Sequence, residues 1–163
     1  SFDGPIAIRY PRGSAHQGLQ EYQAPVEYGR SEIIRKGKKI AVLGVGSMIP
    51  SCMEICKGLK DDGYDPTFVN ARFVKPLDVD LLDELAKDHS LFVTVEENVK
   101  SGGYGEHVSA YMEACHPEIR VLSAAVWDRF VPQGNVESLR SRIGLGVEDI
   151  RQAIEDSEEL REQ

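Results

Sequence analysis

The segment Ile40-Ala41-Val42-Leu43-Gly44-Val45-Gly46 decides the fold class of this chain. It is a nearly continuous apolar run, without the alternation of apolar and polar residues that a half-exposed strand shows. Such a run is typical of a central strand that is buried on both faces of a sheet. Residues 51–60 follow with apolar side chains at helical spacing, and Gly63 stands where that helix should end. A buried strand that leads into an amphipathic helix is the repeating unit of an α/β sheet.

The same alternation of strands and helices continues toward the C-terminus. Strands are predicted at residues 67–71, 91–95 and 120–124, and helices from Asp78, beyond residues 102–105 and from Asn135 onward. Asp78 suits the N-cap position, because its carboxylate can accept a backbone N–H of the first helical turn. Short connections between alternating elements imply a mainly parallel sheet covered on both faces. The predicted fold is therefore a three-layer α/β/α domain.

The N-terminal third predicts one antiparallel strand and a domain boundary. Residues 27–35, a polar turn at 36–39 and the apolar run that follows together predict an antiparallel hairpin. Residues 5–10 predict a short strand that belongs to whatever lies upstream, and the aperiodic stretch after it predicts a connection. We therefore assign residues 1–25 to the end of a preceding domain with its linker, and residues 26–163 to the α/β domain.

Composition excludes several classes of function. The chain has 163 residues, with 19 Lys and Arg against 27 Asp and Glu and a net charge of −8. This balance argues against nucleic acid and against anionic membrane surfaces, which are bound by basic residues. No apolar run approaches the roughly 20 residues that span a bilayer, and the opening residues lack a secretory signal. Three cysteines do not suggest a disulfide framework, so a cytoplasmic location is expected.

Two motifs have both a structural and a functional interpretation. Gly44-x-Gly46 follows a strand and precedes a helix, as a phosphate-binding loop would, but position 49 is Ile49 where the dinucleotide fingerprint has glycine. A tight turn is the favoured interpretation. Cys52 and Cys56 lie one helical turn apart and are interpreted as buried packing thiols, with a metal or nucleophile role as the alternative.

Charged residues mark the predicted carboxyl edge of the sheet, where ligands bind in open α/β folds. Arg72, Glu97 and Asp128 each follow a predicted strand, and they could serve a small molecule, a docking face or only structure. Arg9 and Arg12 flank Tyr-Pro, and a guanidinium at this turn could bind phosphate or carboxylate or make a structural ion pair. His16 lies close to this turn and is retained as a weaker candidate. None of the four histidines has a Cys or acidic residue at metal-ligand spacing, so no metal site is expected.

Five motifs in order resemble one known family. They are Arg9-Tyr10-Pro11-Arg12-Gly13, Ala-Arg-Phe-Val-Lys-Pro-Leu-Asp at 71–78, Thr-Val-Glu-Glu-Asn at 94–98, Gly-Gly-Tyr-Gly at 102–105 and Asp-Arg-Phe-Val-Pro-Gln-Gly at 128–134. Together they resemble the C-terminal part of the 1-deoxy-D-xylulose-5-phosphate synthases, a thiamine-diphosphate-dependent family of the transketolase superfamily. The resemblance covers the chain from about residue 4 to about residue 154.

The resemblance implies a role within a larger homodimeric enzyme. That enzyme condenses pyruvate with D-glyceraldehyde 3-phosphate, releases CO₂ and supplies isoprenoid, thiamine and pyridoxal synthesis. Thiamine diphosphate and Mg²⁺ would be held by the other domains, because the diphosphate-binding motif is absent here. The resemblance therefore implies a fragment that is inactive alone, binds no cofactor and contributes no catalytic residue. It implies that Arg12 binds the substrate phosphate, with Arg9 as a second candidate, and that the domain packs at the dimer interface.

Two alternatives stay open from the sequence. One is the equivalent domain of a transketolase or of a 2-oxo acid dehydrogenase beta subunit, because the Thr-Val-Glu-Glu and Pro-Leu-Asp segments are shared widely in the superfamily. The other is a non-catalytic interaction domain. The Arg-Tyr-Pro-Arg-Gly, Arg-Phe-Val-Lys-Pro-Leu-Asp and Asp-Arg-Phe segments favour the synthase family over the first of these alternatives.

Overall fold

The computed structural model describes residues 2–10, 18–22 and 24–157. Within them, five strands form one sheet in the order β1-β3-β2-β4-β5. The strands are β1 (Glu32–Arg35), β2 (Lys39–Gly44), β3 (Thr67–Asn70), β4 (His89–Val99) and β5 (Arg120–Val126). Only β1 runs antiparallel to its neighbour among these strands, and the other three pairs are parallel. The prediction of a mainly parallel sheet with one antiparallel strand is confirmed.

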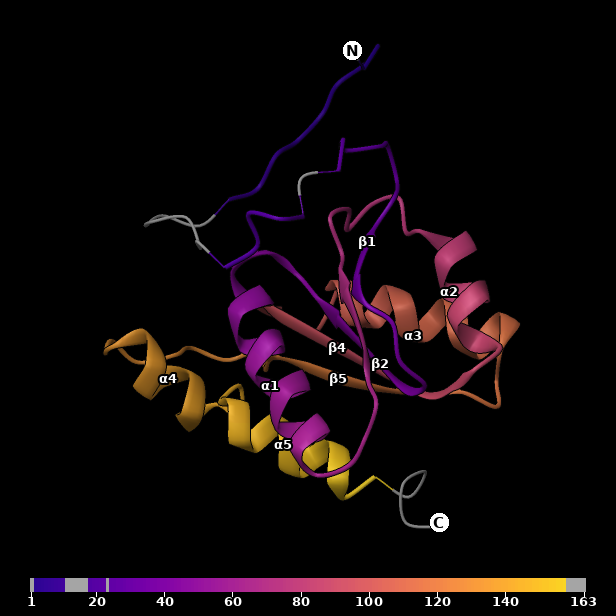
Figure 1. The fold of residues 1–163 in the computed structure, drawn as a ribbon. Coiled ribbons are helices and arrows are strands. Elements are labelled where there is room, and N and C mark those ends of the chain that lie inside the picture. The colour runs from indigo at the N-terminus through magenta and orange to yellow at the C-terminus, as the bar shows by residue number, and fades with distance from the viewer. Residues whose placement is uncertain (1, 11–17, 23, 158–163) are drawn as a thin grey trace.

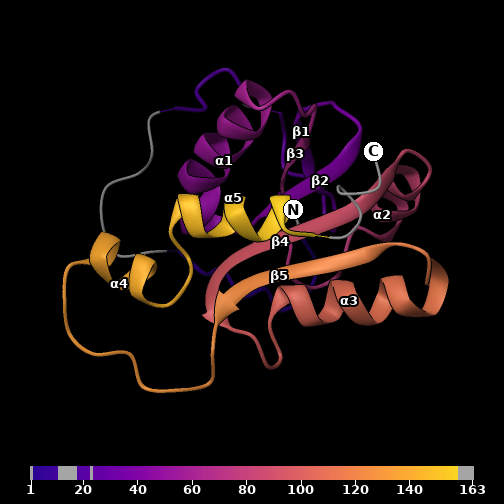
Figure 2. The ribbon, with the colours of Figure 1, turned by 90° about the horizontal axis from the view of Figure 1, so that it is seen from below.

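Helices cover both faces of this sheet (Figures 1 and 2). α1 (Ile49–Asp61) and α5 (Val147–Glu155) pack on one face, and α2 (Val79–Ala86) and α3 (Tyr104–Cys115) pack on the other. A 3-10 turn, η1 (Gly46–Met48), precedes α1, and α4 (Val136–Arg142) lies between β5 and α5. The three-layer α/β/α prediction is therefore confirmed. No helix in the described part of the chain is long and apolar enough to cross a membrane.

β2 is the central strand, as its apolar sequence predicts. Ile40 and Val42 pack with α1 and α5, whereas Ala41 and Leu43 pack with α2 and α3. Successive side chains of a strand point to opposite faces, so an apolar residue is needed at every position of a strand covered on both sides. These four side chains are at most 1% exposed.

The predicted antiparallel hairpin between residues 27–35 and the central strand is wrong. β1 pairs with β3 instead, with Ile33 opposite Val69, so β1 and β2 lie on either side of β3. The connection between them crosses the start of β3, where the Gly37 N–H donates to Thr67 Oγ1 at 2.9 Å. A methyl group on Gly37 would overlap the carbonyl oxygen of Asp65. The lack of a side chain at this residue therefore permits a crossing in place of a hairpin turn.

Two other boundaries differ from the sequence prediction. Residues 5–10 are exposed and form no strand, because no strand in the described residues lies beside them to pair their backbone. β4 is longer than predicted and continues through Glu96 and Glu97 to Val99. The helices predicted from the apolar spacing are all present, and Asp78 accepts the Leu81 N–H at the start of α2, at 3.4 Å.

His89 joins three elements at the amino edge of the sheet. Its Nδ1 lies 2.8 Å from the Leu85 carbonyl oxygen, and its Nε2 lies 2.7 Å from Thr67 Oγ1. A carbonyl only accepts, so Nδ1 carries the proton and Nε2 accepts the threonine hydroxyl. Burial lowers the pKa of His89, because the charged ring would lose its hydration, and the Leu85 carbonyl offsets only part of this effect. The folded structure therefore favours the neutral ring.

We expect the free energy of unfolding to fall as the pH is lowered from 7.5 to 5.5. An unfolded histidine has a pKa of about 6.5, and the folded His89 has a lower one, so the unfolded chain takes up the proton first. The stability is thus complete above about pH 6.5 and is lost as the pH falls toward the folded pKa. Urea unfolding at both pH values measures this. His89→Gln should flatten the profile, and the exposed His107→Gln should leave it intact; the reverse would contradict the assignment.

Candidate functional site at the carboxyl edge of the sheet

The candidate site lies where β4 and β5 end side by side (Figure 2). The parallel strands direct their carboxyl ends to this edge, which is where ligands bind in open α/β sheets. η1 follows β2 at the same edge, and the chain passes from β5 to α4 beside it. Side chains that are far apart in the sequence therefore meet here.

Glu97 is the centre of this cluster. Its Oε1 accepts Arg140 Nε at 3.0 Å, and its Oε2 accepts Ser47 Oγ at 2.8 Å. The three residues come from β4, η1 and α4, so the carboxylate ties two helical segments to the end of the sheet. The sequence identified Glu97 as a candidate because it follows a predicted strand. Arg140 and Ser47 belong to no recognisable motif, so the sequence gave no indication of their role.

The environment of Glu97 keeps it ionised. Burial by itself would raise its pKa, but the hydrogen bonds from Arg140 and Ser47, with the positive charges of Arg140 and Arg9, outweigh burial and lower the pKa. An ionised carboxylate repels phosphate, so Glu97 is suited to holding cations in place and not to binding an anion directly.

Arg9 reaches this edge from the upstream segment. Its terminal nitrogen donates to the Glu97 main-chain carbonyl at 3.4 Å, and the side chain is exposed. With respect to the described residues, this long hydrogen bond occupies one of the five N–H donors of the guanidinium. Arg12 and His16, the other candidates from this segment, lie outside the described residues.

A small apolar cavity adjoins Glu97 and Arg140. It has a volume of about 160 Å³ and is otherwise lined by Val126, Val131, Val136, Leu139 and Ile143. Aliphatic side chains give it no hydrogen-bonding group other than the ion pair at its rim. The cavity is thus a gap under α4 and lacks the polar groups that orient a substrate.

Glu96 has a different role from its neighbour. Because strand side chains alternate, it points to the opposite face, where it is 2% exposed. Its two carboxylate oxygens accept the backbone N–H groups of Tyr104 and Gly105 at 3.0 and 2.8 Å. These N–H groups belong to the first turn of α3, where backbone N–H groups have no acceptor within the helix. Glu96 is therefore a structural acceptor, which the sequence did not separate from Glu97.

Arg72 and Asp128, the other two charged candidates that follow predicted strands, are not part of this cluster. Arg72 forms an ion pair with Glu32 on β1 and donates to the carbonyl oxygens of Ala24 and Pro25. It thus fixes the segment before β1 to the end of β3. Asp128 is exposed on the loop after β5, next to Trp127, whose ring lies 5.0 Å from Lys100 Nζ.

The glycine and cysteine motifs have structural explanations. A side chain on Gly44 would lie 2.8 Å from Cys52 Sγ, and Gly46 has a φ of +53°, so both glycines serve a tight turn. Cys52 and Cys56 are buried, and burial raises the pKa of both thiols, that of Cys56 to about 12. Protonated, buried thiols are poor nucleophiles. Within the described ranges, no three His, Cys, Asp or Glu residues gather as a metal site would require.

Comparison with known proteins agrees with this architecture. Residues 29–150 match the family described as Transketolase, C-terminal domain. The chain is 42% identical over 150 residues to the 1-deoxy-D-xylulose-5-phosphate synthase of Lachnoclostridium phytofermentans, which covers 91% of the chain and 24% of that protein. It is 40% identical over 148 residues to the enzyme of the same name from Chlorobaculum tepidum, covering 90% of the chain and 23% of that protein. The chain thus spans about a quarter of the length of these relatives.

Solved structures share the fold. A structure described as a split gene transketolase, inactive beta4 tetramer, superposes with a TM-score of 0.76 at 29% sequence identity, covering 83% of this chain and 44% of that one. The transketolase of Campylobacter jejuni superposes with a TM-score of 0.56 at 15% identity, covering 79% of this chain and 19% of that one. The second likeness concerns the fold alone.

Proposed function

This chain belongs to the transketolase C-terminal domain family, and we propose that it is the C-terminal domain of a 1-deoxy-D-xylulose-5-phosphate synthase. The observation that carries the proposal is 42% identity to such a synthase over 91% of the chain. The split gene transketolase is less similar, at 29% identity. In the proposed parent enzyme, pyruvate condenses with D-glyceraldehyde 3-phosphate and CO₂ is released. We propose in addition that the product of this reaction supplies isoprenoid, thiamine and pyridoxal synthesis, and that the enzyme is cytoplasmic.

Thiamine diphosphate and Mg²⁺ belong to other parts of that enzyme in this proposal. The residues that the structure describes do not fit them, because no cluster of metal ligands is present there. At Gly44, the space that a side chain would take is occupied by Cys52 and Ile49, and position 49 lacks the third glycine of the dinucleotide fingerprint. We therefore propose that residues 26–163 are a non-catalytic domain that packs against the remaining domains and in the dimer, after a linker within residues 1–25.

The contribution that we propose for this chain is recognition of the aldehyde's phosphate. Arg12 is the main candidate and Arg9 the second. Arg9 supports the proposal because its guanidinium lies at the carboxyl edge of the sheet, beside the Glu97 carbonyl. A phosphate dianion is bound best by charge-assisted, bidentate donors, which arginine provides.

We expect Arg12→Ala in the full-length enzyme to raise KM for D-glyceraldehyde 3-phosphate by about ten- to a hundredfold. This range corresponds to the roughly 1.5–3 kcal/mol of one hydrogen bond to a charged group. The KM for pyruvate should stay nearly unchanged, because pyruvate carries no phosphate. Arg9→Ala should have a smaller effect in the same direction, and Arg142→Ala, which is exposed on α4, is the matched control. Equal changes for both substrates would reject the phosphate role.

The same full-length protein separates the alternatives. A synthase joins pyruvate to D-glyceraldehyde 3-phosphate with release of CO₂, whereas a transketolase moves a two-carbon unit between sugar phosphates without releasing CO₂. If the chain is a non-catalytic interaction domain, the full-length protein that contains it should catalyse neither reaction. Assay of both reactions, with the 163-residue chain alone as the blank, tests the parent activity and the proposed inactivity of this part.

A further inference from the structure

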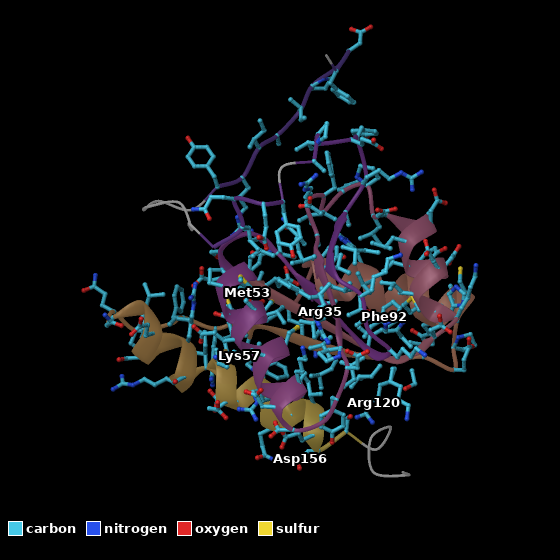
Figure 3. All side chains as sticks on the ribbon, in the orientation of Figure 1. Arg35, Met53, Lys57, Phe92, Arg120 and Asp156 are labelled. Atoms are coloured by element: carbon cyan, nitrogen blue, oxygen red, sulfur yellow. The ribbon has the colours of Figure 1, made fainter. Side chains whose placement is uncertain are left out.

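A groove beside α1 is not explained by the proposed function. Its volume is about 340 Å³, and its walls come from the segment at residues 18–22, from β1 and from α1. The residues that shape it most directly are Leu19, Tyr22, Ile34, Met53, Cys56 and Phe68. Figure 3 shows two of the lining side chains on α1, Met53 and Lys57, and a third, Arg35, on β1. The volume falls at the lower end of small-molecule sites, which span roughly 300–1,000 Å³.

The floor of this groove is apolar and packs against the hydrophobic core. Phe68 and Cys56 are 3% and 6% exposed, and Leu19, Ile34 and Met53 pack partly buried against the same cluster. The Cys56 thiol is held protonated by its raised pKa of about 12, for which burial is the main cause. A ligand here would therefore be held by non-covalent contacts with hydrocarbon and thiol groups.

The rim of the groove is positively charged, although the whole chain carries −8. Lys57 and Lys60 are exposed, lie three residues apart on α1 and so point to one side of the helix. Among the residues that the structure describes, neither ammonium makes an ion pair. Arg35 at the same rim is paired with Asp65 and donates to the Pro66 carbonyl at 2.8 Å. Glu21 is the one acidic residue in the described lining, so cations outnumber it.

We propose that this groove binds a small amphipathic anion, with an apolar body on Met53 and Phe68 and a carboxylate or phosphate head on Lys57 and Lys60. Two lysines that form no ion pair with any described acidic residue, next to an apolar floor, complement a molecule with these two ends. The described lining of this groove shares no residue with the cluster of Glu97, Arg140 and Ser47. It therefore stands independently of the phosphate role proposed for Arg12.

The experiment titrates the 163-residue chain with octanoate, followed by the methyl NMR signals of Met53 and Ile34. Saturable shifts at both methyl groups are expected. The double variant Lys57→Glu/Lys60→Glu should weaken octanoate about tenfold, because two attractive charges at the rim become repulsive. Lys87→Glu/Lys100→Glu, which changes the net charge equally at exposed lysines elsewhere, should leave binding unchanged. Met53→Trp, which fills the groove, should abolish it.

Titrations with octan-1-ol and octyl phosphate test whether the groove recognises the charge of the head group. The alcohol should bind at least tenfold more weakly than octanoate, and octyl phosphate should bind at least as tightly as octanoate, because the head group is recognised by charge. Equal binding of alcohol and carboxylate, equal binding by the double variant, or shifts centred on Val131 and Ile143 instead would each overturn the proposal. Thermal unfolding of every variant verifies that the fold is retained, which is expected for exposed lysines.

Discussion

Gly37→Ala is expected to destabilise the domain by about 3 kcal/mol or more. A methyl group at residue 37 would overlap the Asp65 carbonyl oxygen and lie 2.5 Å from the carbonyl carbon of Pro66. Both are backbone atoms, so no side-chain rotation relieves the overlap, and the crossing itself must open. That movement would also break the hydrogen bonds from Gly37 N–H to Thr67 Oγ1 and from Lys38 N–H to the Asp65 carbonyl.

Equilibrium unfolding in urea measures this loss. Gly134→Ala is the matched control, because the atoms nearest to the added methyl group belong to the Leu139 side chain, the first at 3.2 Å, and a side chain can move where backbone cannot. We expect the control to stay within about 0.5 kcal/mol of the parent chain. A similarly small loss for Gly37→Ala would show that the connection between β1 and β2 does not cross the start of β3 as described.

Glu96→Gln is expected to cost about 2–3 kcal/mol, although it changes one atom. Each carboxylate oxygen accepts a buried N–H at the start of α3. A glutamine has only one acceptor oxygen, so its amide NH₂ would face one of these N–H groups, donor against donor. The variant also loses the favourable interaction of a negative charge with the N-terminus of a helix.

Hydrogen exchange and urea unfolding together test this prediction. The amides of Tyr104 and Gly105 should exchange faster in Glu96→Gln, while those in the centre of β2 should change only with the global stability. Glu97→Gln is the matched neighbour, with a side chain that is 37% exposed and bonded to Arg140 and Ser47. We expect it to cost less than about 1 kcal/mol. Equal losses for the two variants would contradict the division of roles within the pair.

The carboxyl edge was only partly predictable from the sequence. The pattern of strands placed Glu97 near the end of β4, because ligand-binding edges follow from strand direction. It could not show that Arg140 and Ser47 meet Glu97, since they lie 43 and 50 residues away. Contacts of this range depend on how α4 folds back, and a polar residue on a short helix looks the same in the sequence whether or not it has a partner.

Hydrophobic periodicity predicted two kinds of element: helices, whose backbone hydrogen bonds lie within the element, and strands that are buried on both faces. The run at residues 40–46, the helix at 51–60 and the cap at Asp78 are local patterns, so β2, α1 and α2 could be read directly from them. The sequence by itself thus determined the layers, the central strand and most helix positions. Hydrophobic spacing and capping are local properties that the packed domain retains.

Tertiary structure alone decided which strands pair. Residues 32–35 are extended in either arrangement, but the backbone of β1 bonds β3 across the Gly37 crossing and not β2. Residues 5–10 are similar in composition to a strand and form none, because a strand exists only where a neighbour bonds its backbone. The opposite roles of Glu96 and Glu97 were decided in the same way, by the helix or turn that each face of β4 meets. Strand pairing and side-chain burial depend on partners that are distant in the chain, and the local sequence does not indicate which partners these are.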